Sequence, residues 1–220
     1  GSSANDTIDG NGGSDTLIGG LGVDTFLVSH GTTTVNDLGN GGYDNFIVEK
    51  GAKLIAIATS NWIGSRSVIN EGEATIQSKG KLVDLSLLPE RNGFKLENIG
   101  GSTKLIGSAA EDTIMGGKFS DTLQGFGGSD TISGGLGADT FLVDVGTDKI
   151  TDLGLGGSDI IQVYLGAKVD AVLATHWVGR GTVNYSDDGS ARIFANGKSV
   201  NLSSVTTGNG YYIENLSDVG

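Results

Sequence analysis

A nine-residue rhythm in residues 107–142 constrains the fold of this chain more than any other feature of its sequence. Cut every nine residues, the stretch reads GSAAEDTIM, GGKFSDTLQ, GFGGSDTIS and GGLGADTFL. Every one of these nonapeptides has Gly at its first place, Asp at its sixth, Thr at its seventh and an apolar residue at its eighth. The rhythm fits neither the period of a helix nor that of a strand, so it predicts a repeating unit of one turn and one short strand.

The three residues after each Asp predict a very short strand whose middle, apolar side chain points inward. Two nonapeptides would then make one flattened turn of a solenoid. Each inward residue would stack on its counterpart eighteen residues further along, and each strand would pair in parallel with the next turn. We therefore expect an all-β parallel solenoid whose core is a ladder of stacked apolar side chains.

The chain also repeats itself on a longer scale, because nearly everything in residues 1–100 recurs in residues 107–216. For example, GGLGVDTFLV resembles GGLGADTFLV, and VNDLGNGGYDNFIV resembles ITDLGLGGSDIIQV. We expect two tandem copies of one unit, stacked without a linker, the second with one extra nonapeptide. The predicted boundaries are 1–106 for copy one, with its nonapeptide block at 1–47 and spacer coils at 48–106, and 107–220 for copy two, with its block at 107–162 and spacer coils at 163–220. Since the chain begins and ends with this unit, we expect it to be a segment of a longer array.

The spacer coils lack the nonapeptide but alternate short apolar runs with Gly, Asn and Ser, which predicts further strands. Residues 51–62 and 166–177 are ambiguous between a strand and a short helix, and we favour the strand. Trp62 and Trp177 occupy equivalent places near the ends of these stretches. We expect them to plug the core rather than to stack on a sugar.

The composition narrows the class of partner. A formal net charge of −12 argues against nucleic acid and against adsorption to anionic membranes, and it suits cations. No apolar run approaches the roughly 20 residues of a membrane span, so we expect no membrane insertion. With no cysteine, a Gly-rich fold outside the cell cannot rely on disulfides, and a metal ion is the candidate that replaces them.

The six-residue turn before each strand carries the chemistry of a metal site. Glycines at places one, two and four allow backbone conformations that turn several carbonyls toward one point, and Asp at place six aims a carboxylate at the same point. Oxygen ligands without His or Cys suit calcium better than magnesium. Stacked turns would otherwise bring carboxylates close enough to repel one another, so we expect folding to depend on calcium.

The pattern resembles the RTX (repeats-in-toxin) family, whose repeat is GGxGxDxUx. Residues 19–27 and 134–142 match this repeat fully, and all nine of the better units have Gly first and Asp sixth. The resemblance implies a right-handed parallel β-roll with several calcium ions. Each ion would lie between turns n and n+2, held by the place-six Asp and by the carbonyls of places one, two and four.

The metal ligands that the resemblance implies come from both copies. In copy one they are Asp6, Gly10, Gly13, Asp15, Gly19, Gly20, Gly22, Asp24, Gly39, Gly42 and Asp44. In copy two they are Asp112, Gly116, Gly117, Asp121, Gly125, Gly128, Asp130, Gly134, Gly135, Gly137, Asp139, Asp148, Gly154, Gly157 and Asp159. The implied carboxylate pairs are Asp6 with Asp24, Asp24 with Asp44, Asp112 with Asp130, Asp121 with Asp139, Asp130 with Asp148, and Asp139 with Asp159.

Departures from the repeat predict unequal sites. Thr33 stands in copy one where copy two has Asp148, so the site facing Asp15 should be weak or empty. Preferred glycines near the start of each copy are replaced by Ser2, Ala4, Ser108, Ala110 and Phe119. We expect more calcium in copy two than in copy one. The competing interpretation is that the aspartates only cap turns through their own backbone amides.

We interpret the chain as a calcium-dependent structural module of a large secreted or cell-surface bacterial RTX protein, such as an adhesin. The resemblance implies type I secretion of an unfolded chain that folds in external calcium. No nucleophile–base arrangement or phosphate loop is apparent in the sequence, so an enzyme is not expected. The alternative is an accessory module that binds polysaccharide in a groove lined by Trp, Tyr211, Tyr212 and Arg or Lys, or, less favoured, ice on its threonine ladders.

Overall fold

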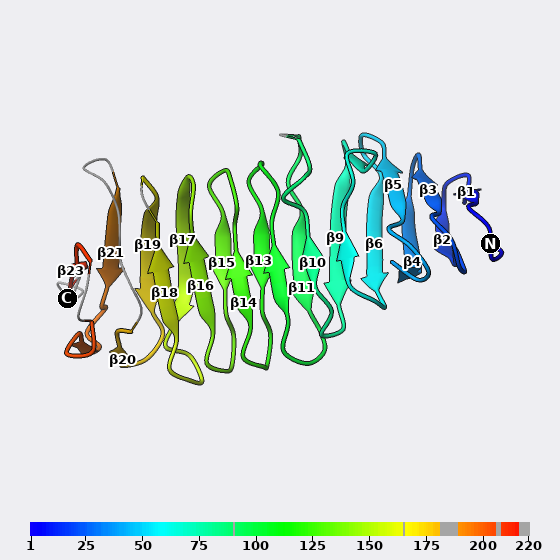
Figure 1. Ribbon diagram of the computed structural model, residues 1–220. Coiled ribbons are helices and arrows are strands. Elements are labelled where there is room, and N and C mark those ends of the chain that lie inside the picture. The colour runs from blue at the N-terminus through cyan, green and yellow to red at the C-terminus, as the bar shows by residue number, and fades with distance from the viewer. Residues whose placement is uncertain (90, 165, 181–188, 206–207, 216–220) are drawn as a thin grey trace.

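The computed structural model describes residues 1–89, 91–164, 166–180, 189–205 and 208–215. In these residues the chain is an all-β parallel solenoid of about ten turns. The turns follow one another along a rod, with β1 (Thr7–Asp9) and β23 (Tyr212–Glu214) at opposite ends (Figure 1). These residues contain no helix, and therefore none that could span a membrane.

The largest sheet extends over almost the whole rod. Its eleven strands follow the order β2 (Ser14–Leu17), β4 (Thr32–Leu38), β6 (Lys53–Ala58), β9 (Glu73–Ser78), β11 (Lys95–Asn98), β13 (Thr113–Met115), β15 (Thr131–Ser133), β17 (Thr147–Leu153), β19 (Lys168–Leu173), β21 (Ser190–Phe194) and β23. Three smaller sheets take the intervening strands. They are β1, β3 (Thr25–Val28), β5 (Asn45–Val48) and β8 (Ile69–Asn70); β7 (Trp62–Ile63), β10 (Val83–Asp84), β12 (Lys104–Ile106), β14 (Thr122–Gln124), β16 (Thr140–Val143) and β18 (Ile160–Val163); and β20 (Trp177–Val178) with β22 (Val200–Asn201).

The strand register confirms the stacking that the nine-residue rhythm predicts. Ile114 of β13 lies opposite Ile132 of β15, eighteen residues further along, and the pairing is parallel. Two extra residues, Asp and Leu, precede the last nonapeptide of each block, and there the step grows to twenty. Phe141 of β16 accordingly lies opposite Ile161 of β18. Two nonapeptides therefore make one turn.

Strand pairing continues from copy one into copy two. β11 pairs with β13 and β12 pairs with β14, so both sides of the coil cross the predicted junction near residue 107. The two stretches stack as one continuous solenoid without a linker, as expected. The handedness of the coil and the boundaries of the two copies stay predictions.

The core is the predicted ladder of inward side chains. In the second nonapeptide block its members are fully buried, and they are Ile114, Leu123, Ile132, Phe141, Ile150 and Ile161. The residues beside them on each strand face outward, as Met115 does with 41% of its surface exposed. Each of the four regular nonapeptides of this block therefore contributes one side chain to the core, whereas the degenerate one, residues 143–151, contributes Val143 as well as Ile150.

Two further expectations about the spacer coils are confirmed. The ambiguous stretches contain β6 and β19, so they are strands and not helices. Trp62 and Trp177 are 0% and 2% exposed, and each indole nitrogen donates a hydrogen bond at 3.0 Å to a backbone carbonyl, that of Asp44 or Asp159. Both tryptophans plug the core beside the last nonapeptide of a block.

Ile114→Ala tests the ladder. The free energy of unfolding should fall by about 2–5 kcal/mol, because a cavity would open between stacked turns. Met115→Ala is the matched control, and it should change that free energy by no more than about 0.5 kcal/mol. Urea unfolding followed by circular dichroism in calcium-containing buffer measures both. Equal losses would mean that the ladder is not the core.

Candidate metal centre

Each place-six aspartate ends a tight turn, and the shape of the turn before Asp139 requires glycine. Gly135 and Gly137 have φ values of 84° and 131°, in the region that side-chain-bearing residues rarely adopt. A Cβ on either residue would also collide with the backbone of the turn eighteen residues earlier. The turns are therefore packed closely along the rod, and the aspartates that end them stack above one another.

The structure brings together all six predicted carboxylate pairs. In each pair the Oδ1 atom of the later Asp accepts a hydrogen bond from the backbone N–H of the earlier one. The N–O distances are 2.8 Å for Asp6–Asp24, 2.9 Å for Asp24–Asp44, 2.7 Å for Asp112–Asp130, 2.8 Å for Asp121–Asp139, 3.2 Å for Asp130–Asp148 and 3.0 Å for Asp139–Asp159. Turn capping is thus part of the role of these aspartates, but the capped amide lies on the preceding turn.

The second carboxylate oxygen, Oδ2, has no protein partner in several of these aspartates. It is buried and without a hydrogen bond in Asp15, Asp24, Asp121, Asp130, Asp139 and Asp148. Leaving a charged oxygen buried and unpaired is expensive, so such an atom requires a proton or a cation. Capping alone leaves these atoms unexplained, whereas a metal ion would explain them.

The place-one glycine keeps open the space beside this oxygen. A Cβ at Gly10 would lie 2.5 Å from the Asp15 Oδ2 atom, and a Cβ at Gly125 would collide with the Asp130 carboxylate. Among the described residues no three acidic, His or Cys side chains converge on one point. A cation here would therefore take oxygens from backbone carbonyls as well as carboxylates. Such an all-oxygen, irregular ligand set fits calcium.

Four of the predicted aspartates differ, because their Oδ2 atoms are satisfied within their own turns. Ser2 and Ser108 donate backbone N–H bonds at 2.5 Å to Asp6 and Asp112, and the Ser108 hydroxyl adds a bond at 3.0 Å. The amides of Gly39 and Gly154 do the same for Asp44 and Asp159, at 2.7 and 2.6 Å. Two pairs, Asp121–Asp139 and Asp130–Asp148, keep both Oδ2 atoms unpaired, and both lie in copy two.

Asp15 lies opposite Thr33, as the sequence predicts. Its Oδ2 atom is unpaired, but the hydroxyl-bearing side chain across from it carries no charge. This turn therefore lacks the second carboxylate that the other pairs have.

Burial also raises the pKa values of several of the stacked aspartates. It raises the pKa of Asp139 to about 7 and the pKa values of Asp44, Asp112 and Asp159 to about 6. The pKa values of Asp130 and Asp148 rise for the same reason, and repulsion from neighbouring aspartates adds to the increase. Without a cation, burial and mutual repulsion disfavour the ionised form of these carboxyl groups.

Sequence reasoning missed two further aspartates, Asp37 and Asp152. The Asp37 carboxylate accepts bonds from the amides of Gly19 and Gly20 at 3.0 and 2.8 Å. The Asp152 carboxylate accepts from Gly134 and Gly135 at 3.0 and 2.9 Å. The sequence does show that an inserted Asp-Leu pair occurs in both copies. Only the fold shows that its carboxylate binds the amides of a glycine turn.

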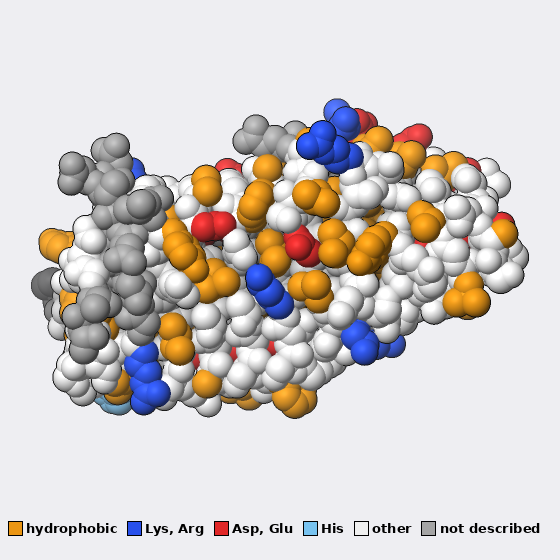
Figure 2. All heavy atoms as spheres, viewed as in Figure 1, with side chains coloured by type: hydrophobic (Ala, Val, Ile, Leu, Met, Phe, Trp, Pro, Cys, Tyr) orange, Lys and Arg blue, Asp and Glu red, His pale blue; other side chains and the backbone are white. Residues whose placement is uncertain are grey.

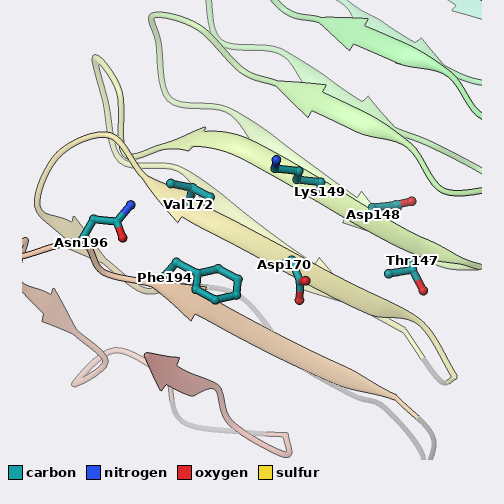
Figure 3. A pocket seen from close by; sticks show the side chains of 7 residues that line it. All are labelled: Thr147, Asp148, Lys149, Asp170, Val172, Phe194 and Asn196. Atoms are coloured by element: carbon teal, nitrogen blue, oxygen red, sulfur yellow. The ribbon is translucent and has the colours of Figure 1, made fainter. Parts of the chain in front are cut away.

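The residues proposed for a polysaccharide groove do not line one together. Both tryptophans are buried, and Tyr211 packs edge-on against Trp177 with 5.5 Å between ring centres. A shallow hollow of about 430 Å³ does exist on the outer face of β17, β19 and β21 (Figure 3). Its aromatic residue, Phe194, lies beneath the Arg192 guanidinium, 5.4 Å from the ring centre. That guanidinium is in turn held by Asp170.

Basic side chains occur in small separate groups on the face shown in Figure 2. Among the described residues of the whole rod, several basic side chains are paired with acids, as Lys53 is with Glu73 at 2.8 Å. That face has no continuous basic surface of the kind that phosphate backbones favour.

Comparison with known families agrees with the site. The family model for RTX calcium-binding nonapeptide repeats, four copies long, matches residues 1–26 and 106–141. These two stretches are RTX repeats. They contain the turns from Asp6 to Asp24 and from Asp112 to Asp139, and they lie within one parallel β-roll. No curated protein and no solved structure matches the chain significantly.

Gly125→Ala tests the space beside the carboxylate. The new Cβ would displace the Asp130 side chain, so calcium affinity at the RTX turns that share Asp130 should fall by about 10-fold or more. Isothermal titration calorimetry measures the affinity. Gly101→Ala is the matched control, because a Cβ there meets no atom within 4 Å. Similar affinities for the two variants would contradict the site.

The raised pKa values predict that acid stabilises the calcium-free fold. Between about pH 4 and pH 7 the folded state binds more protons than the unfolded state, whose aspartates titrate near pH 4. The extra stability is complete below that range and is lost as pH rises through the folded pKa values, such as about 7 for Asp139. Circular dichroism in calcium-stripped buffer should therefore show more β structure at pH 5 than at pH 8. The reverse order would refute the prediction.

Proposed function

We propose that this RTX chain is a calcium-dependent structural module of a large secreted or cell-surface bacterial protein, adhesin-like in character. The observation that supports this most directly is the stack of buried aspartates whose Oδ2 atoms lack protein partners. The module would be exported unfolded and would fold when external calcium fills the stack.

The proposed ligands are the place-six carboxylates together with the carbonyls of the turn glycines. The strongest sites in this proposal are Asp121–Asp139 and Asp130–Asp148, because both members of each pair have an unpaired Oδ2 atom. Sites that include Asp6 or Asp112 would be weaker, because serine already satisfies those carboxylates. This ranking supports the expectation of more calcium in copy two.

Calcium would act as the folding signal because the two sides of a membrane differ in calcium concentration. Sites of extracellular modules are typically half-filled near 10⁻⁴–10⁻³ M, far above cytosolic calcium. In the cytosol the stacked carboxylates would stay uncompensated, and the chain would stay unfolded for export. Outside, binding would contribute directly to the free energy of folding.

A role as a spacer in an adhesin agrees with the rod-like shape in Figure 1. A parallel solenoid presents no deep cleft, and each turn contacts mainly its neighbours. RTX repeats are usual in secreted bacterial proteins, which supports the proposed location.

Circular dichroism during a calcium titration tests the proposal. In EGTA at neutral pH the chain should lack β structure, because the carboxylate stack repels itself. Calcium near millimolar concentration should restore the structure, and renewed chelation should remove it. Magnesium at the same concentration is the control ion and should have little effect. A chain that is β-folded in EGTA and unchanged by calcium would overturn the proposed function.

A further inference from the structure

The aspartate of each inserted Asp-Leu pair accepts hydrogen bonds from backbone amides of a glycine turn earlier in the chain. In the regular nonapeptides the place-one amide donates to a backbone carbonyl seventeen residues further along, as Gly116 does to Ser133 at 2.9 Å. At Gly134 that amide instead donates to Asp152 Oδ1 at 3.0 Å, and the next amide, Gly135, donates to Oδ2 at 2.9 Å. One carboxylate thus holds two successive peptide groups.

Holding these amides also fixes a carbonyl. The Gly135 N–H and the Gly134 C=O belong to one planar trans peptide, so they point in opposite directions. The Gly134 oxygen points back to the preceding turn, where it would lie 2.5 Å from a Cβ placed on Gly116. That position is beside the Asp121–Asp139 pair, one of the two with both Oδ2 atoms unpaired. The Gly125 oxygen points back at Gly107 in the same way, so the bonds to Asp152 hold this orientation and do not create it.

The same arrangement occurs independently in copy one. Asp37 holds the amides of Gly19 and Gly20, and the Gly19 oxygen points back at Gly1, beside the Asp6–Asp24 pair. Asp152 is itself fixed by the Ser133 hydroxyl at 2.6 Å. Both carboxylate oxygens of Asp37 and of Asp152 thus accept hydrogen bonds from backbone amides or a hydroxyl. Either aspartate therefore acts on the ion only through the peptide group that it holds.

We propose that Asp152, and Asp37 in copy one, are positioning residues that hold the place-one carbonyls of Gly134 and Gly19 in the direction of the calcium ion of the preceding turn. The proposal rests on the proposed calcium-dependent function. It assigns a purpose to the Asp-Leu insertion, which would otherwise only lengthen the coil.

Asp152→Asn in the full chain tests this role. The asparagine side chain has one acceptor oxygen, and its NH₂ group would face a backbone N–H. It can therefore accept from only one of the Gly134 and Gly135 amides. A calcium titration followed by NMR should show an affinity about 10-fold lower at Asp121–Asp139, as is typical when an outer-shell partner is lost, with little change at Asp130–Asp148. The Gly134 and Gly135 amides should exchange faster with solvent in the calcium-saturated protein.

Glu111→Gln is the matched control, because it removes the same charge from an exposed place on a nonapeptide turn. It should leave both affinities and both amides as in the unsubstituted chain. Equal weakening of the two sites by Asp152→Asn would mean a general charge effect and would overturn the proposal. Unchanged affinity or unchanged amide exchange would also overturn it, while calcium binding by the unsubstituted chain would leave the proposed function intact.

A chain without substitutions that binds no calcium would overturn both proposals at once. If Asp152→Asn does not regain its circular dichroism at saturating calcium, Asp37→Asn provides the second test. Asp37 lies near one end of the rod, so the turns beyond it should fold regardless. The Gly19 and Gly20 amides should then lose protection while the Asp130–Asp148 site keeps its affinity, and retained protection would contradict the role.

Discussion

A buried aspartate that satisfies one carboxylate oxygen and leaves the other bare is the interaction on which this solenoid depends. The first oxygen ties each turn to the preceding one through a backbone amide, as Asp139 does with Asp121. The second oxygen is buried without a protein partner, so its charge requires a cation or a proton to be stabilised. One residue type therefore aligns the turns and, in the proposed function, also decides when they can stack.

The thin core explains why the condition matters. A regular nonapeptide contributes a single side chain to the core, and its burial is worth about 1.5–3 kcal/mol. Ordering the backbone of nine residues costs more than that, at about 1 kcal/mol or more for each residue. The ladder from Ile114 to Ile161 thus cannot carry the fold alone, and the remainder must come from strand pairing and from whatever neutralises the carboxylates.

The sequence predicted the parts of the structure that follow from the period. A repeat of nine residues, with one inward position each, sets the register at eighteen and brings the aspartates into stacks. It could not indicate which Oδ2 atoms stay unpaired, because that depends on donors such as the Ser108 amide and hydroxyl in the folded turn. It also missed Asp152, since the partners of that carboxylate lie seventeen and eighteen residues earlier in the chain and meet it only in the coil.

The extra nonapeptide of copy two determines which sheet the later strands join, because successive nonapeptides alternate between two sheets. Nine residues make half a turn, so β13 belongs to the large sheet and β14 to the opposite one. Without that half turn, every later strand would exchange sides. With it, the long strands β4 and β17, which carry Asp37 and Asp152, lie in the same sheet. The extra nonapeptide therefore sets which sheet each later strand joins, so Asp37 and Asp152 lie along the same side of the rod.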